Sequence, residues 1–254
     1  MRKEVKGELK GSNCFARKLK GRCMRQLGGH KVMSLLFLLT SLPFSLTSFS
    51  QTPKHWRDSV SVLIEQINLH PNSIDLRLKK AEANINLSQY DYAAEEYSKV
   101  LKLDEHNLAA LYFRAFCYTQ LRQYGMARAD YDAFLAIQPE HLEAHLGLAH
   151  VLQLQNRRAD AVDELNRCVQ MFPDSADAYA ARAAYETQLE QYDAAIYDWD
   201  EALRLKPKDA EFAVSKVDVL LKMGRIREAR EALDKAVKQG TPRAALKEWY
   251  DKCK

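Results

Sequence analysis

The sequence contains little glycine, proline or cysteine. Among its 254 residues there are 9 Gly, 7 Pro and 5 Cys. Because Gly and Pro form tight turns, these low numbers argue against a β fold with many strands. Five Cys are too few to hold a chain of this length together by disulfides. The sequence also lacks a G-x-S-x-G nucleophile elbow, a phosphate loop and a dinucleotide fingerprint, which are the usual signals of three large enzyme classes.

The net charge of +4 is unevenly distributed along the chain. Residues 1–50 hold ten of the 38 Lys and Arg but only two of the 34 Asp and Glu, which gives this leader a charge of +8. The remaining 28 basic and 32 acidic residues give residues 51–254 a charge of −4. A mildly acidic body is a poor match for phosphate backbones, so we do not expect nucleic-acid binding.

The leader contains one short hydrophobic run within residues 32–49, strongest at Leu35–Leu39. The run is shorter than the roughly 20 apolar residues that a membrane-spanning helix needs. It is preceded by Arg25 and Lys31, as in the positively charged start of a signal peptide. The sequence therefore predicts an export signal, and an exported protein that is periplasmic or secreted.

Small residues before Gln51 predict where this signal is cut, close to Ser50 and Gln51. The leader is long for a signal peptide, and Met24 and Met33 are both candidate starts of the natural chain. If the hydrophobic run is retained, the alternative is a protein anchored in the inner membrane.

The rest of the chain is an internal repeat of 34 residues. Residues of the same kind recur at this spacing in four columns: Ala81, Ala115, Ala149, Ala183 and Val217; Ala93, Ala127, Ala161, Ala195 and Ala229; Tyr97, Tyr131, Leu165, Trp199 and Leu233; and Pro139, Pro173 and Pro207. Two helices approach closely only where their side chains are small, and Pro cannot continue a helix. The columns therefore predict two antiparallel helices in each unit, with Pro at its end.

The repeat divides residues 74–243 into five units without an insertion. The units span residues 74–107, 108–141, 142–175, 176–209 and 210–243. Stacked units bury a continuous core only if their ends are covered. Residues 54–71 resemble a second helix with its stop and are expected to cap the first unit through Val60, Leu63, Ile64 and Ile67; residues 243–253 are expected to form a C-terminal capping helix.

These columns resemble the tetratricopeptide repeat family. The best matches are Leu111, Ala115, Tyr118, Ala127, Tyr131, Phe134 and Pro139, and Tyr179, Ala183, Ala195, Trp199, Ala202 and Pro207. The first and last units depart from the pattern, with Glu105 and Thr241 in the place of Pro. The resemblance implies an all-α fold, a right-handed solenoid of antiparallel helix pairs, and binding of partner segments on a concave face formed by the first helix of each unit.

Carried over by register, the resemblance gives a candidate partner groove. Its residues are Asp75, Leu78, Glu82, Tyr112, Phe116, Glu143, Leu146, His150, Asp177, Glu211 and Asp218. The surplus of acids, with Tyr112 and Phe116 as aromatic anchors, predicts a ligand segment with an apolar anchor and Lys or Arg flanks. The alternative is that Leu78, Tyr112 and Leu146 pack between units. The lysine and arginine positions with which chaperone-binding members clamp a carboxylate are not matched here.

Three groups of reactive side chains were weighed as sites and are expected to be structural. His141, Glu143, His145 and His150 form the one cluster with the look of a metal site, but their order differs from H-E-x-x-H and no Cys lies nearby. The acids that flank Tyr131 and Trp199 are expected on a solvated face. Cys168 falls in a core column and is expected to be an inert thiol.

The sequence thus predicts a non-enzymatic scaffold that needs no cofactor or metal and binds a protein or peptide in its concave groove. A membrane-anchored assembly factor of the cell envelope with the same fold is the first alternative. A metal-dependent enzyme that uses the histidine cluster is the second, and metal analysis of the purified protein would separate it from a scaffold.

The leader gives a first test. We expect protein recovered from cells to begin at Gln51, because a signal peptidase accepts the small residues before it. Terminal sequencing or intact mass measures this directly. A chain that keeps residues 32–49 and stays with the membrane fraction would support the anchored alternative instead.

Overall fold

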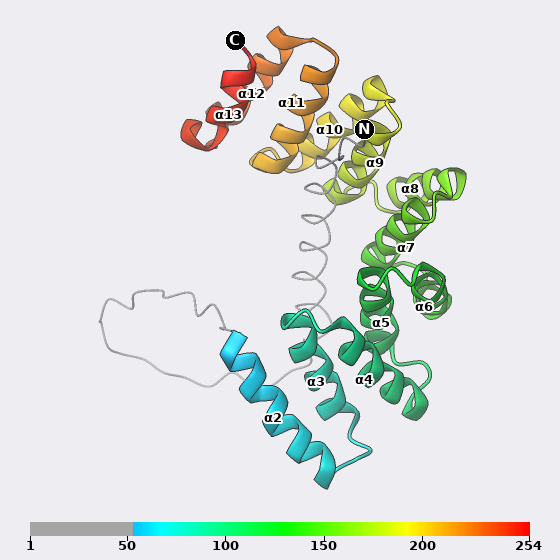
Figure 1. Cartoon of the computed structure of the whole chain (residues 1–254). Helices are drawn as coiled ribbons and strands as arrows, with labels where there is room; N and C mark the ends of the chain where they lie inside the picture. The colour runs from blue at the N-terminus through cyan, green and yellow to red at the C-terminus, as the bar shows by residue number, and fades with distance from the viewer. Residues whose placement is uncertain (1–52) are drawn as a thin grey trace, which may run out of the picture. The chain divides into compact units, whose positions relative to one another are not determined.

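The structure, a computed structural model, describes residues 53–254. Within these residues the chain forms twelve α-helices and one short 3-10 helix and no strand, which confirms the all-α prediction (Figure 1). None of the helices in residues 53–254 is long and apolar enough to cross a membrane. The predicted signal, its cut and the candidate starts lie outside the described residues.

The described residues fall into two compact units that divide after Leu121, and each is considered by itself. The first unit holds α2 (Pro53–Leu69), α3 (Ile74–Asn86), α4 (Tyr90–Leu103) and α5 (Leu108–Gln120). The second unit holds α6 (Tyr124–Ile137), α7 (Leu142–Leu154), α8 (Arg158–Met171), α9 (Ala176–Gln188), α10 (Tyr192–Leu205), α11 (Ala210–Lys222), α12 (Ile226–Lys238), the 3-10 helix η1 (Arg243–Leu246) and α13 (Lys247–Lys252).

Each first helix of a repeat begins after a residue whose side chain caps it. The caps recur at the 34-residue spacing and accept a hydrogen bond from a backbone N–H in the first turn; they are Ser73, Asn107, His141, Ser175 and Asp209. Such a bond satisfies one of the amides that the start of a helix leaves without a partner. The same five helices, α3, α5, α7, α9 and α11, are all 13 residues long.

The turn after each first helix contains a residue in the left-handed region. The residues are Ser88, Arg122, Asn156, Glu190 and Gly224, with φ between 58° and 71°. The first of these turns is closed by the N–H of Gln89, which donates to the carbonyl of Asn84 at 2.9 Å. Only the last turn uses Gly, the residue that adopts this conformation without steric cost. The backbone pattern of the repeat therefore imposes the turn even where the side chain disfavours it.

The predicted core columns are buried. The two alanine columns, including Val217, are inaccessible, and the column of large residues from Tyr97 to Leu233 is at most 5% exposed. In the second unit Ala183, Ala195 and Trp199 belong to one apolar cluster, and Val217 and Leu233 belong to another. These observations confirm that small residues bring paired helices together and that a large residue fills the space beside them.

The two ends are covered as follows. At the N-terminal side α2 packs against α3, with Ile67 buried and Val60 and Leu63 half-buried. The prediction that Ile64 also packs there is wrong, because Ile64 points to solvent and is 43% exposed. At the C-terminal side η1 and α13 replace the single expected helix, and Leu246 enters the last core cluster.

Gly147 supplies a test of the close packing in the second unit. A Cβ at this position of α7 would lie 2.5 Å from the ring of Tyr131 on α6, which is buried. We expect Gly147→Ala to lower the free energy of unfolding by about 1–2 kcal/mol, because overpacking costs more than the helix gains from losing a glycine. Urea unfolding measures the change.

The matched control is Gly125→Ala in α6, where an added Cβ meets nothing within 4 Å. This variant should be neutral or more stable, by up to about 1 kcal/mol. Equal effects of the two substitutions would contradict the account of the packing.

Candidate functional site

The residues predicted to bind a partner lie on the first helices of the repeats. In the first unit α3 contacts α5, and in the second α9 contacts both α7 and α11. Each unit therefore carries a row of neighbouring first helices (Figure 1). The rows bring together Asp75, Leu78, Glu82, Tyr112 and Phe116 in the first unit, and Glu143, Leu146, His150, Asp177, Glu211 and Asp218 in the second.

The aromatic residues of the first row differ in accessibility. Tyr112 is only 2% exposed and its ring packs edge-on against Phe113, with centroids 5.2 Å apart. Phe116 is half-buried and is held edge-on by Tyr90, with centroids 6.0 Å apart. Leu78 is also half-buried. Tyr112 thus belongs to the helix packing, whereas Phe116 and Leu78 offer surface to a ligand.

The second row shows the same division. Leu146 is buried, and His150 is half-buried. Burial lowers the pKa of His150 despite its hydrogen bond with Gln153, so this imidazole is neutral at pH 7. The face of α7 therefore presents a neutral ring rather than a cation.

Several of the predicted acids make contacts within their own unit. Asp75 pairs with Lys79 at 2.7 Å on the surface of α3. Asp177 pairs with Lys206 at 2.7 Å, and Asp218 accepts a hydrogen bond from Trp249 Nε1 at 2.9 Å. Glu143 lies 3.6 Å from His141, and Glu211 is exposed near the start of α11. The acids therefore help to hold helices in place, and their charge is only partly available to a ligand.

A second set of charges, which the sequence analysis did not identify, lies buried between helices. Arg182 on α9 donates to both oxygens of Asp198 on α10, at 2.6 and 2.9 Å, and to Asn166 on α8 at 3.0 Å. The prediction of a solvated face is wrong for Asp198, which is 1% exposed, and for Asp130, which is also buried. A buried carboxylate needs such partners to offset its desolvation.

This arrangement follows the repeat register. Lys80 pairs with Glu96 at 2.9 Å, and Lys216 pairs with Asp200 at 2.7 Å. Lys80, Arg182 and Lys216 occupy the seventh position of their first helices. A basic residue that recurs at this position, together with an acid 16 residues further on in the first and fourth repeats, was the signal that could have revealed the pairs.

The third repeat solves the same problem with a histidine. Its seventh position is Leu148, and the buried Glu164 of α8 is contacted by His145 Nδ1 instead. The other ring nitrogen of His145 lies 2.7 Å from the carbonyl oxygen of Pro139. Burial opposes the charged imidazole, but these two partners outweigh it and raise the pKa of His145.

The histidine cluster therefore has structural roles. His141 Nδ1 accepts the N–H of Ala144 at 3.2 Å as the cap of α7, and burial lowers the pKa of His141. Nowhere in residues 53–254 do three or more His, Cys, Asp or Glu gather in a way suited to hold a metal. Cys168 is fully buried, and burial raises the pKa of its thiol to about 12, as expected for an inert core residue.

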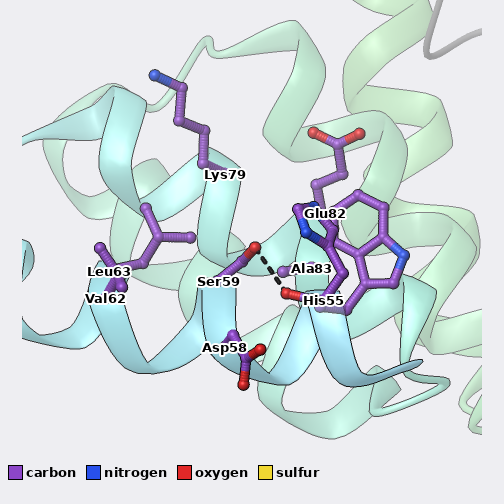
Figure 2. A pocket seen from close by; sticks show the side chains of 9 residues that line it. His55, Asp58, Ser59, Val62, Leu63, Lys79, Glu82 and Ala83 are labelled. Carbon is purple, nitrogen blue, oxygen red and sulfur yellow. Dashed lines mark hydrogen bonds between the residues drawn. The ribbon is translucent and has the colours of Figure 1, made fainter. Parts of the chain in front are cut away.

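The first unit also contains a pocket of about 460 Å³ between α2 and α3. The α2 wall includes Trp56, Ser59, Val62 and Leu63, and Figure 2 shows most of this wall beside the α3 residues. Those α3 residues are Lys79, Glu82 and Ala83. One of the predicted groove residues, Glu82, thus borders a cavity that the sequence analysis did not predict.

Comparison with known proteins identifies the fold family. Family models described as tetratricopeptide repeat match residues 118–176, 146–210 and 187–248, which together span about half of the chain. The chain belongs to the tetratricopeptide repeat family, as the 34-residue columns indicated.

Individual relatives are distant. The DnaJ protein P58IPK homolog B of Oryza sativa subsp. japonica is 28% identical over 196 residues, which is 75% of this chain and 37% of that protein. The chain thus spans less than two fifths of the length of this curated relative. A tetratricopeptide repeat protein of known structure from Parabacteroides merdae shares 17% identity at a TM-score of 0.61, over 94% of this chain and 90% of its own.

The structure of YrrB, described as a tetratricopeptide repeat protein with an unusual peptide-binding site, is also similar in fold. It shares 18% identity at a TM-score of 0.51, over 70% of this chain and 92% of its own.

Glu186 on α9 provides a test of the buried charges. Burial, with the nearby charge of Asp198, raises the pKa of Glu186 to about 7 from an ordinary 4.5. The folded chain then binds a proton more tightly than the unfolded chain, so the destabilisation is absent below pH 4.5, grows between pH 4.5 and 7, and is complete above pH 7. Glu186→Gln should therefore raise the melting temperature by a few degrees at pH 8 and much less at pH 4.5. Equal changes at the two pH values would contradict this assignment.

Proposed function

We propose that the chain is a non-enzymatic scaffold that binds a segment of a partner protein on the faces of its first helices. Tetratricopeptide repeat proteins generally act as protein-interaction scaffolds. The described residues use their histidines and buried acids to hold helices together, which leaves binding as the activity that the surface supports.

The observation that carries this proposal is the environment of Phe116. Its ring is fixed from one side by Tyr90, is half-buried, and lies on the same row as the half-buried Leu78. An aromatic side chain that is already held in place loses little conformational entropy on binding. Rigid aromatic anchors of this kind often supply much of the affinity of an interface.

The ligand is an extended or helical peptide segment with an apolar side chain that packs on Phe116. The predicted Lys or Arg flanks remain part of the proposal, although Asp75, Asp177 and Asp218 already have partners within the chain. Paired acids attract a basic ligand less than free ones, so the apolar contact should contribute most of the binding energy. That YrrB is described with a peptide-binding site agrees with this kind of ligand.

Export by the leader is also a proposal, based on residues 32–49 and their basic flank. In an exported protein the partner would be a protein of the envelope or the medium.

Selection from a displayed random-peptide library tests the proposed function. We expect the full chain to select peptides with an apolar or aromatic residue. Phe116→Ala should weaken their binding by about tenfold or more, as loss of a moderate hot spot does. Fluorescence anisotropy with one selected peptide measures the affinity, and circular dichroism checks that the variant folds.

Tyr92→Ala is the matched control. Tyr92 lies on the second helix α4 and is 56% exposed, so it is an accessible aromatic residue outside the first-helix row. Its loss should leave the affinity unchanged. The proposal fails if no peptide is selected, or if Phe116→Ala binds as tightly as the unchanged chain.

A further inference from the structure

The pocket between α2 and α3 has the position of a missing helix. In register, α2 is a second helix, since it lies 34 residues before α4. The second helices α4, α8, α10 and α12 each pack against the first helix of their own repeat. The described residues contain no first helix for α2.

The lining of the pocket matches the surfaces that first helices cover elsewhere. Ser59 corresponds to Ala93 and Ala195, which are inaccessible under their first helices. Leu63 corresponds to Tyr97 and Trp199, which are at most 5% exposed. At the pocket, by contrast, Ser59 and Leu63 are only half-buried, so surface of the kind that is buried in those repeats stays open here.

The α3 side of the pocket agrees with this correspondence. Glu82 and Trp56 both line the pocket, and one period later Phe116 and Tyr90 are in ring contact beside α3. Ala83, a small residue, forms part of the floor. Small residues on both walls allow a third helix to approach closely, as in the complete repeats.

We infer that this pocket, here called the helix slot, binds a single amphipathic helix of about 13 residues from a partner protein. The slot is defined by Trp56, Ser59, Val62, Leu63 and Ala83. The length follows from the first helices of the chain, all of which have 13 residues. The site is distinct from the face around Phe116 and can exist whether or not that face binds a peptide.

The wall of the slot also determines the chemistry of the helix. In the first and fourth repeats the residue equivalent to Val62 is a buried acid, Glu96 or Asp198, and the seventh residue of the first helix is basic. Val62 is apolar and 52% exposed. The partner helix should therefore carry an apolar residue at its seventh position, followed by a small residue that faces Ser59.

The chain's own sequence argues against an internal occupant. The thirteen residues one period before α3, 40–52, contain Pro43 and seven Ser or Thr. Pro and Ser or Thr are weak helix formers, and the predicted cut before Gln51 would remove most of this segment. A helix from another protein fits the slot better on both grounds.

The first helix of the third repeat is a suitable probe, because it has Leu148 at its seventh position and Ala149 after it. A fluorescently labelled peptide with the sequence of residues 142–154 and a solubilising lysine tail should bind the full chain in an anisotropy titration. A peptide of this length is only partly helical when free, so moderate affinity is expected. The same peptide with Leu148→Arg should bind at least about tenfold more weakly, because it places a charge against Val62.

Two serines of α2 give matched variants of the protein. Both donate a hydrogen bond to the carbonyl four residues earlier, Ser59 to His55 at 2.9 Å and Ser61 to Arg57 at 3.3 Å, but only Ser59 lines the slot. Ser59→Arg should abolish binding of the probe, and Ser61→Arg should leave it unchanged. Melting curves confirm that both variants are folded, and peptides that depend on Phe116 should still bind Ser59→Arg.

Three results would overturn the inference. The first is equal binding of the probe by the Ser59→Arg variant and the unchanged chain. The second is a full chain that binds no probe, whether or not removal of residues 1–50 restores binding; restored binding would make the leader the occupant. The third is self-association that Ser59→Arg abolishes, which would assign the slot to a second copy.

Discussion

The close approach of paired helices at alanine is the constraint on which the rest of this structure depends. Ala81 and Ala93 are inaccessible in the first unit, and Ala183 and Ala195 are inaccessible in the second. A larger side chain at these places would separate the helices and open cavities along the stack. Because the spacing of the alanines is constant, the helix lengths, caps and turns recur with the same period.

That constraint explains why the sequence predicted most of the fold. Small residues, capping residues and Pro act locally, so their recurrence gives the helix pairs without knowledge of distant contacts. The exceptions are at the ends, where the period stops. Ile64 was expected to pack and is exposed, and the C-terminal cap is divided into η1 and α13, because no following repeat fixes their positions.

The candidate site was less predictable, because accessibility depends on neighbouring helices. Tyr112 and Phe116 are one turn apart on α5, yet Tyr112 is buried and Phe116 is not. Asp198 looked like a surface acid until Arg182 was found beside it. Register alone places a residue on a helix, whereas the partner across the helix interface decides whether that residue serves folding or binding.

The division of labour between the helices is the central claim: buried pairs fix the stack, and the first helices keep the surface that a ligand uses. Hydrogen–deuterium exchange of the full chain, with and without a selected peptide, tests it most directly. The account predicts added protection in α3 and α5 and no change in α12. Protection confined to second helices such as α4 and α12 would contradict it.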